Sequence, residues 1–197
     1  MESTLYQLSP ATAHDEGRVV STGIPALDAC LPQGGWPRVG LIELRVEDAG
    51  AAMLPLLLPH MAQLSQAARW QAWLSPPFAP YLPALERAGV AADHLLLIRP
   101  RSHQNGLEVL ERALALGNFV SVFAWPLAQE TDLMQRLRAA AQRGRCQAFL
   151  FSTLADDRVA ADVDLCLRVR SHSEGLNIER LSSRARRGQP ASALLRQ

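Results

Sequence analysis

Residues 39–46 read Val-Gly-Leu-Ile-Glu-Leu-Arg-Val, a run of strand-forming residues between chain breakers. The segment 32–35, Pro-Gln-Gly-Gly, precedes the run, and two acids followed by a small-residue stretch come after it. Aliphatic and β-branched side chains bounded in this way indicate a buried β-strand. We therefore place the first core strand at 39–46, and a short helix over 24–31 before it, where Pro25 suits the first helical turn.

Strands and helices alternate strictly after this first strand. The apolar patterns predict strands over 70–74, 94–98, 119–124 and 146–151, and helices over 53–68, 82–88, 105–116 and 130–143. Such alternation with apolar strands favours an α/β fold, a mostly parallel sheet with helices on both faces. The last two predicted strands, 163–170 and 176–182, are joined by a turn-like segment and predict an antiparallel C-terminal hairpin at the edge of the sheet.

Length and composition indicate one folded domain. The chain has 197 residues, 48% of them hydrophobic and 20% charged, which is typical of a globular protein. The pattern predicts a flexible lead-in over 1–20, a domain over 21–183 and an arginine-rich flexible tail over 184–197. The amino terminus lacks the basic and apolar segments of a secretory signal, and the sequence contains no membrane-spanning stretch, so we expect a cytoplasmic protein.

Every basic residue is an arginine, because the 20 Lys and Arg residues include no lysine. Schiff-base chemistry and the phosphate-binding lysine of a Walker A loop are therefore excluded. Residues 180–197 hold five arginines and no acid, which leaves 15 arginines and 19 acids before them, a charge of −4 against +5 in the tail.

The loop after the first strand is where a parallel sheet would hold a nucleotide. A nucleotide loop needs several glycines, a lysine and a hydroxyl group, whereas this loop offers two acids, one glycine and alanines. The residues of this degenerate nucleotide loop are Glu47, Asp48, Gly50, Ala51 and Ala52. We therefore expect no bound ATP and no cofactor.

Other catalytic and metal motifs are missing from the sequence. The five histidines are not spaced as metal ligands, and the three cysteines lack a Cys-x-x-Cys pair, so we expect reduced, mostly buried thiols. Four acids, Asp156, Asp157, Asp162 and Asp164, are interpreted as solvated carboxylates rather than a metal site. Glu43 lies inside an apolar strand, so it needs a buried partner, for which an arginine or the backbone is the simplest choice.

Two regions are candidates for binding a partner. Trp36 lies in a Gly/Pro loop, where it is either an exposed anchor or a core residue. The tail carries arginines with a small apolar pair, namely Arg180, Arg184, Arg186, Arg187, Leu194 and Leu195. Arginine forks suit both phosphates and carboxylates, so DNA, an acidic protein groove and solvent all remain possible surroundings. The negative charge of the body and the Leu-Leu pair favour a protein.

A resemblance to known families is carried by residues 21–44, STGIPALDACLPQGGWPRVGLIEL, which are similar to the opening of the RecA core. The match is closer to the ImuA proteins, RecA-like accessory factors of damage-induced mutagenesis. The shared motifs are Gly-Gly-Trp-Pro at 34–37, Leu-Leu-Leu-Pro at 56–59, the segment 79–85 and Ala-Trp-Pro at 124–126. The ATP-handling positions of RecA would fall near Ala51, Ala52, Pro77 and Ala124 or Trp125, all of them replaced.

The ImuA resemblance implies a non-catalytic accessory factor of SOS-induced, error-prone translesion synthesis in a bacterial cytoplasm. It implies contacts with an ImuB-type inactive polymerase and an error-prone replicative-type polymerase, RecA as a further candidate partner, and weak or indirect DNA contact. The cell-division inhibitor SulA is also similar, over about residues 39–151, and provides the alternative: a stoichiometric inhibitor of the tubulin-like division protein. A DNA-stimulated ATPase is disfavoured by the missing lysine. The oligomeric state stays open.

Overall fold

The computed structural model describes residues 17–47, 53–125, 131–153, 161–181 and 192–196. Its helices are α1 (Pro25–Cys30), α2 (Leu54–Leu64), α3 (Leu82–Arg87), the 3-10 helix η2 (Ala92–His94), α4 (His103–Ala115) and α5 (Thr131–Gly144). Its strands are β1 (Val19–Val20), β2 (Trp36–Pro37), β3 (Gly40–Val46), β4 (Trp70–Leu74), β5 (Leu95–Ile98), β6 (Phe119–Ala124), β7 (Gln147–Thr153), β8 (Leu165–His172), β9 (Gly175–Leu181) and β10 (Ser192–Arg196).

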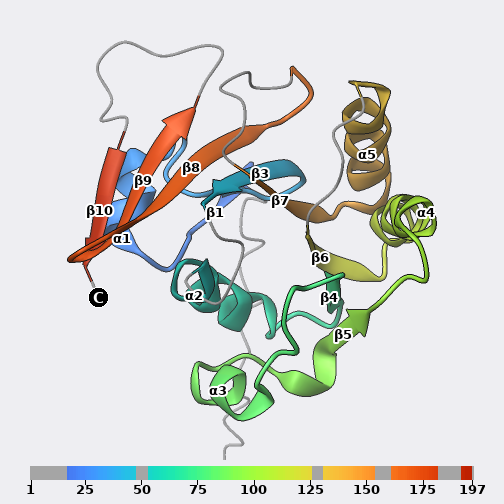
Figure 1. Ribbon diagram of the computed structural model, residues 1–197, viewed down its shortest axis with the longest axis horizontal. Helices are drawn as coiled ribbons and strands as arrows, with labels where there is room; N and C mark the ends of the chain where they lie inside the picture. Colours follow the sequence, from blue (N-terminus) through green and yellow to red (C-terminus); the bar gives the residue numbers. More distant parts are fainter. Residues whose placement is uncertain (1–16, 48–52, 126–130, 154–160, 182–191, 197) are drawn as a thin grey trace, which may run out of the picture.

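The central sheet has eight strands in the order β10-β9-β8-β3-β7-β6-β4-β5 (Figure 1). The six neighbours from β8 to β5 are parallel, and β9 and β10 add to them antiparallel. β3 comes first of these strands in the chain yet lies between β7 and β8. The predicted class, α/β with a mostly parallel sheet, is therefore confirmed.

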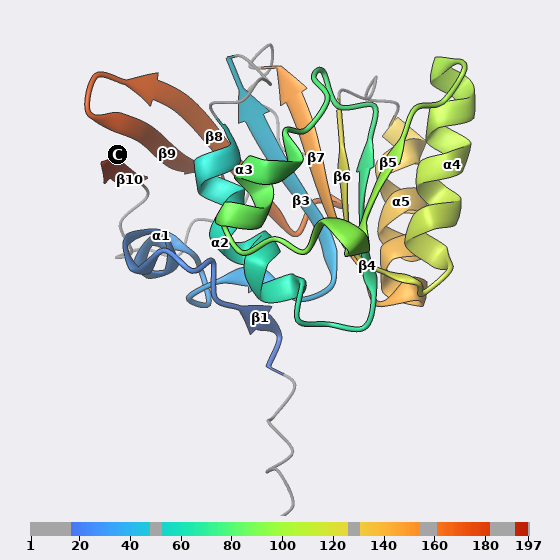
Figure 2. The same ribbon diagram turned by 90° about the horizontal axis from the view of Figure 1, so that it is seen from below.

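Helices lie on both faces of the sheet (Figure 2). Side chains alternate between the faces along each strand, so Ile42 faces a core cluster that includes α2 and α3 residues, whereas Leu41 faces a cluster formed with α4 and α5. Aromatic rings fill the first cluster: Phe123 stacks on Phe149 with centroids 4.8 Å apart, and Trp125 stacks on Phe151 at 4.2 Å. Among the described helices, none is both long and apolar enough to cross a bilayer.

The start of β3 depends on a glycine. Gly40 has a φ of +125°, and a Cβ there would lie 2.2 Å from Asp164 Oδ2. That same oxygen accepts a hydrogen bond of 3.0 Å from the backbone nitrogen of Leu41. Asp164 thus joins the beginning of β8 to the beginning of β3, and only glycine leaves room for this contact.

The chain end differs from the predicted flexible tail over 184–197. Residues 192–196 form β10, which pairs antiparallel with β9 and places Leu195 opposite Leu176. Cys30 Sγ donates a hydrogen bond of 3.3 Å to the carbonyl of Ser192, so α1 also holds this strand. The predicted hairpin is present as β8 and β9, but β10 rather than the hairpin forms the edge. The lead-in is likewise shorter than expected, because Val19 and Val20 form β1.

Candidate protein-interaction surface

The loop after β3 lies mostly outside the described residues. Of the predicted degenerate nucleotide loop, the structure describes Glu47, which is exposed and whose Oε1 lies 3.5 Å from Arg170 Nε. Asp48, Gly50, Ala51 and Ala52 fall outside the described ranges. That this loop binds no nucleotide stays a prediction.

Glu43 has a buried partner, as expected, and of the two choices left open it is an arginine. Its Oε1 and Oε2 accept hydrogen bonds from Arg45 Nε and Nη2, each at 3.2 Å, and the two side chains are 3% and 2% exposed. Ser152 Oγ donates to Oε1 at 2.8 Å, and Cys166 Sγ donates to Oε2 at 3.4 Å. A carboxylate satisfied by a bidentate arginine fork and two further donors is held inside the sheet, which is the signature of a structural network.

The candidate anchor Trp36 is a core residue. Its side chain is fully buried, and its ring meets Phe149 edge-on with centroids 5.3 Å apart. The expectation of an exposed anchor is therefore wrong for Trp36, and core packing, the alternative, holds. The Gly34-Gly35 turn brings the ring inward because Gly35 lies directly against Val20 O, where a Cβ would be only 2.3 Å away.

The candidate tail residues separate into two groups. Arg184, Arg186 and Arg187 lie outside the described residues. Arg180 lies on β9 and donates from Nη1 to the carbonyl of Cys30 at 3.4 Å, and Leu194 is 37% exposed on β10 while Leu195 is half-buried against the core. The structure thus brings Arg180 and the leucine pair together beside α1. Partner binding by this set stays a prediction.

Of the four acids considered for a metal site, two are described by the structure and two are not. Asp156 and Asp157 lie outside the described residues, whereas Asp164 accepts a hydrogen bond of 2.6 Å from Arg138 and Asp162 lies 4.0 Å from the same guanidinium. Within the described ranges, no three His, Cys, Asp or Glu side chains come together in a way that could hold a metal ion.

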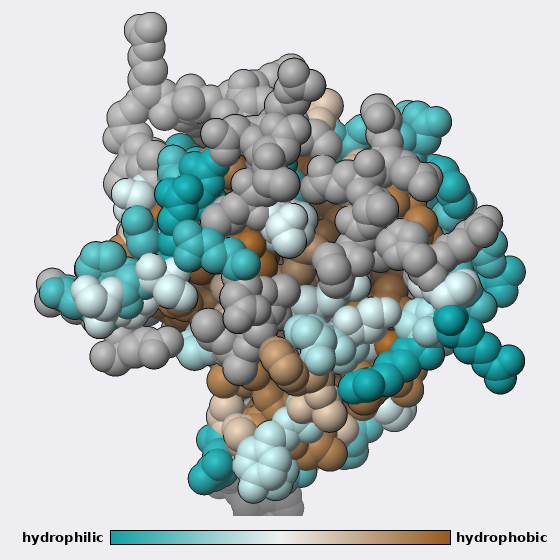
Figure 3. All heavy atoms as spheres, viewed as in Figure 1, coloured by the Kyte–Doolittle hydropathy of each residue, from teal (hydrophilic) through white to brown (hydrophobic). Residues whose placement is uncertain are grey.

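An exposed apolar surface lies at the beginning of α3. We define the α3 surface as Phe78, Tyr81 and Leu82, which are 62%, 68% and 45% exposed. Figure 3 shows apolar side chains gathered over the α3 end of the molecule. β5, the outermost strand beside β4, also leaves Leu96 and Leu97 partly exposed. Large contiguous apolar patches on folded domains are typical of contact sites for proteins, membranes or ligands, so the α3 surface is the candidate contact site of this chain.

The chain presents the α3 surface on a fixed backbone. Ser75, in a left-handed conformation with φ of +52°, donates its backbone N–H to the carbonyl of Ile98 at 2.9 Å. The carbonyl of Tyr81 accepts bonds from the N–H groups of Ala84 and Leu85, at 3.0 and 3.3 Å. Leu85 is buried and packs α3 against the core, while Tyr81 and Leu82 remain at the surface.

Sequence reasoning missed this surface. The segment 79–85 entered the sequence analysis only as a motif of the ImuA resemblance, and Trp70, which is 42% exposed, was not a candidate site residue. The available signal was a pair of aromatic residues, Phe78 and Tyr81, inside a proline-rich segment between two core elements. Proline cannot complete a sheet ladder, so aromatic side chains between prolines have no strand to place them in the core.

The fold places the chain in the α/β class with a mostly parallel sheet, and the α3 surface is its candidate protein-interaction surface. The sequence model of the family "Cell division inhibitor SulA" matches residues 40–148, just over half of the chain. SulA proteins of Yersinia pestis (strain Pestoides F) and Yersinia pseudotuberculosis (serotype O:1b) are each 32% identical over 118 residues, which cover 59% of this chain and 70% of the relative. The chain belongs to the SulA family.

A solved structure is also similar. The crystal structure of SulA from Pseudomonas aeruginosa shares 27% sequence identity with this chain and has a TM-score of 0.48. The similarity covers 57% of this chain and 97% of that one.

The family assignment overturns the ImuA identification. The partners that this identification implied, an ImuB-type polymerase relative, an error-prone polymerase and RecA, are withdrawn with it, and the alternative of a SulA-like cell-division inhibitor is supported instead. The motifs that carried the ImuA resemblance have a structural explanation. Trp36 and Trp125 are buried, and so are Leu56 and Leu57, so three of the four motifs describe the packing of an α/β core. The fourth, the segment 79–85, carries Tyr81 and Leu82 of the exposed α3 surface.

Proposed function

We propose that this chain inhibits cell division by binding the tubulin-like division protein FtsZ through the α3 surface. The observation that carries the proposal is the exposure of Phe78, Tyr81 and Leu82 on a fixed backbone within the family-matched residues. The family's description as cell division inhibitors supports the biological role, and FtsZ is the division protein that SulA proteins bind. Control by the SOS response is consistent with this family.

The inhibitor acts as a stoichiometric binder. Family membership supports the prediction that the protein is not an enzyme. The sequence contains no lysine, so it also lacks the lysine with which a Walker A loop binds the phosphates of ATP. The finer expectation of a RecA-like arrangement belongs to this proposal too, and it is supported by the position of β3, which is flanked by parallel strands on both sides, β7 and β8.

The size of the α3 surface fits a binding hot spot. Aromatic side chains each bury about 150–250 Å² when fully covered, and a few such residues supply most of the binding energy of an interface. At about 25 cal/mol per Å², burying the exposed parts of Phe78 and Tyr81 contributes several kcal/mol before the costs of association. This is enough to make either residue decisive for affinity.

The experiment compares serine variants of exposed apolar residues. Phe78→Ser and Tyr81→Ser should each weaken inhibition of FtsZ polymerisation, followed by light scattering and GTP turnover, by about tenfold or more. Leu116→Ser is the matched control, because Leu116 is 65% exposed at the end of α4 and belongs to neither α3 nor β5. Circular dichroism and thermal melting confirm that each variant is folded.

The outcomes separate the site from the function. Full inhibition by both α3-surface variants would reject the α3 surface as the contact. Failure of the unaltered chain to bind FtsZ, or to produce filamentous cells on expression, would reject the proposed function itself.

A further inference from the structure

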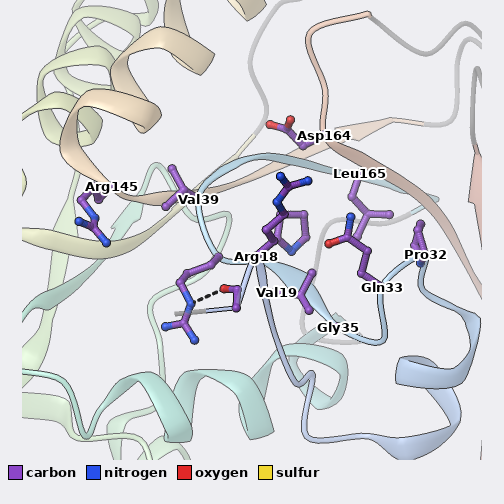
Figure 4. A pocket seen from close by; sticks show the side chains of 12 residues that line it. Arg18, Val19, Pro32, Gln33, Gly35, Val39, Arg145, Asp164 and Leu165 are labelled. Atoms are coloured by element: carbon purple, nitrogen blue, oxygen red, sulfur yellow. Dashed lines mark hydrogen bonds between the residues drawn. The ribbon is translucent and has the colours of Figure 1, made fainter. Parts of the chain in front are cut away.

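A basic hollow of about 430 Å³ opens at the amino-terminal end of the parallel strands (Figure 4). Arg38 and Val39 line it just before β3, Arg145 just before β7, and Asp164 just before β8, while Arg18 approaches from the strand β1 side. Small-molecule sites in proteins have volumes of about 300–1,000 Å³, so the hollow is large enough for a compact ligand. Most of its lining lies outside the family-matched residues 40–148.

Backbone contacts fix two of the three arginines beside each other. The N–H of Arg38 donates to the carbonyl of Arg18 at 2.9 Å, continuing the β1–β2 pairing. Arg38 Nε donates to the carbonyl of Gly17, also at 2.9 Å. Since this bond uses Nε, it orients the guanidinium while its two terminal nitrogens stay available for another acceptor.

Basic side chains outnumber acidic ones in the lining of the hollow. Its lining contains three arginines and one acid, Asp164. Both oxygens of that acid have donors: Oδ1 accepts from Arg138 Nη2 at 2.6 Å, and Oδ2 accepts from the N–H of Leu41 at 3.0 Å. The aspartate is therefore committed to joining α5, β3 and β8, and among the described contacts it pairs with neither Arg18 nor Arg38.

We propose that this hollow binds a phosphomonoester of a small organic molecule. Arginine forks match phosphate oxygens in geometry, and a phosphomonoester carries close to two negative charges at neutral pH, which suits a site with several arginines and one paired acid. Val19, Val39 and Leu165 supply apolar walls for the organic part. The site is separate from the loop after β3 and from the α3 surface, so the inference does not rest on the proposed function.

The test uses phenyl phosphate as the probe and the full chain, with binding measured by isothermal titration calorimetry at low salt. Arg18→Gln should raise the dissociation constant about tenfold, because it removes a charge-assisted hydrogen bond. Arg112→Gln, an exposed arginine on α4 outside the hollow, is the charge-matched control and should leave the constant unchanged. Val39→Phe should weaken binding at unchanged charge by filling the hollow.

Several results would overturn the proposal. Absence of binding by the unaltered chain would do so directly. Equal weakening by Arg18→Gln and Arg112→Gln would mean attraction to the overall charge rather than a site. Unchanged binding by a folded Val39→Phe variant would place the ligand elsewhere, and benzoate binding as tightly as phenyl phosphate would make the site one for carboxylates.

Discussion

His60 on α2 and Gln147 on β7 share a buried hydrogen bond of 2.9 Å between Nε2 and Oε1. The amide nitrogen of Gln147 donates to the carbonyl of Pro37 at 2.7 Å, which assigns the amide oxygen to the imidazole side. Nε2 of His60 therefore carries the proton and donates. Through these two bonds, the neutral imidazole connects α2 with β7 and, through Gln147, with β2.

His60 makes the fold sensitive to acid. Burial lowers the pKa of His60 from 6.5 to about 4, although the hydrogen bond with Gln147 acts in the opposite direction. Between these values the unfolded chain binds the proton and the folded chain does not, so stability is complete above pH 6.5 and is lost as the pH falls towards 4. The total loss is about 3 kcal/mol, at 1.36 kcal/mol per pKa unit.

The measurement is urea unfolding at a series of pH values. His60→Gln should flatten the fall in unfolding free energy between pH 6.5 and 4, whatever its effect at neutral pH. His172→Gln, at the exposed last residue of β8, should keep the pH dependence of the unfolding free energy of the unaltered chain. If the unfolding free energy of His60→Gln falls with pH as steeply as that of the unaltered chain, His60 is not the source of the acid sensitivity.

The thiols of Cys146 and Cys166 should be unreactive in the folded protein. Burial raises the pKa of each to about 12, and the neighbouring Glu43 adds to the effect at Cys166. Because the thiolate is the reactive form, iodoacetamide at pH 8 should leave both residues unlabelled until urea unfolds the chain. Mass spectrometry of the labelled peptides checks this, and labelling of native Cys146 at the rate of a free thiol would refute it.

Local sequence pattern was enough to predict the parallel sheet. The strands at 70–74 and 119–124 agree with β4 and β6 residue for residue, because each is a short apolar run between breakers. The need of Glu43 for a partner was equally predictable, because a carboxylate in a buried strand must be paired. Arg45 lies two residues away on the same face of the strand. These features depend on neighbouring residues.

Features that depend on distant contacts were not predictable in this way. Strand β10 is short and follows an arginine-rich segment, and its position depends on β9 and on Cys30, which is 162 residues away in sequence. Trp36 sits in a Gly/Pro loop that locally indicates exposure, yet Phe149 and His60 enclose it from other elements. The α3 surface was missed for a related reason: only the buried neighbour Leu85 shows which way α3 faces.

Removing one member of the Glu43–Arg45 pair should destabilise the fold more than removing both. Arg45→Met leaves a buried carboxylate without its fork, an effect of about 3–5 kcal/mol. The double variant Glu43→Leu/Arg45→Met removes the uncompensated charge and should recover part of that loss. A double-mutant cycle by chemical unfolding measures the coupling free energy, and strictly additive effects would show that the two groups act independently.

Replacing Arg69 even by lysine should destabilise the fold. Its Nη1 donates to the carbonyl of Arg145 at 2.9 Å, and its Nη2 donates to the carbonyls of Gly144, at 2.6 Å, and Phe119. One guanidinium thus joins the carboxyl end of α5 to the start of β6, where the helix dipole also favours a positive charge.

An ammonium group is a single point of charge and cannot reach all three carbonyls with the same geometry, so Arg69→Lys should lower the unfolding free energy by about 1–3 kcal/mol. Arg136→Lys is the matched control, because Arg136 is 60% exposed and pairs with Glu111 on the surface of α4 and α5, where ion pairs contribute about 0–1 kcal/mol. Chemical unfolding of both variants makes the comparison. Equal stability of Arg69→Lys and Arg136→Lys would mean that charge alone, and not the planar fork, holds α5 to β6.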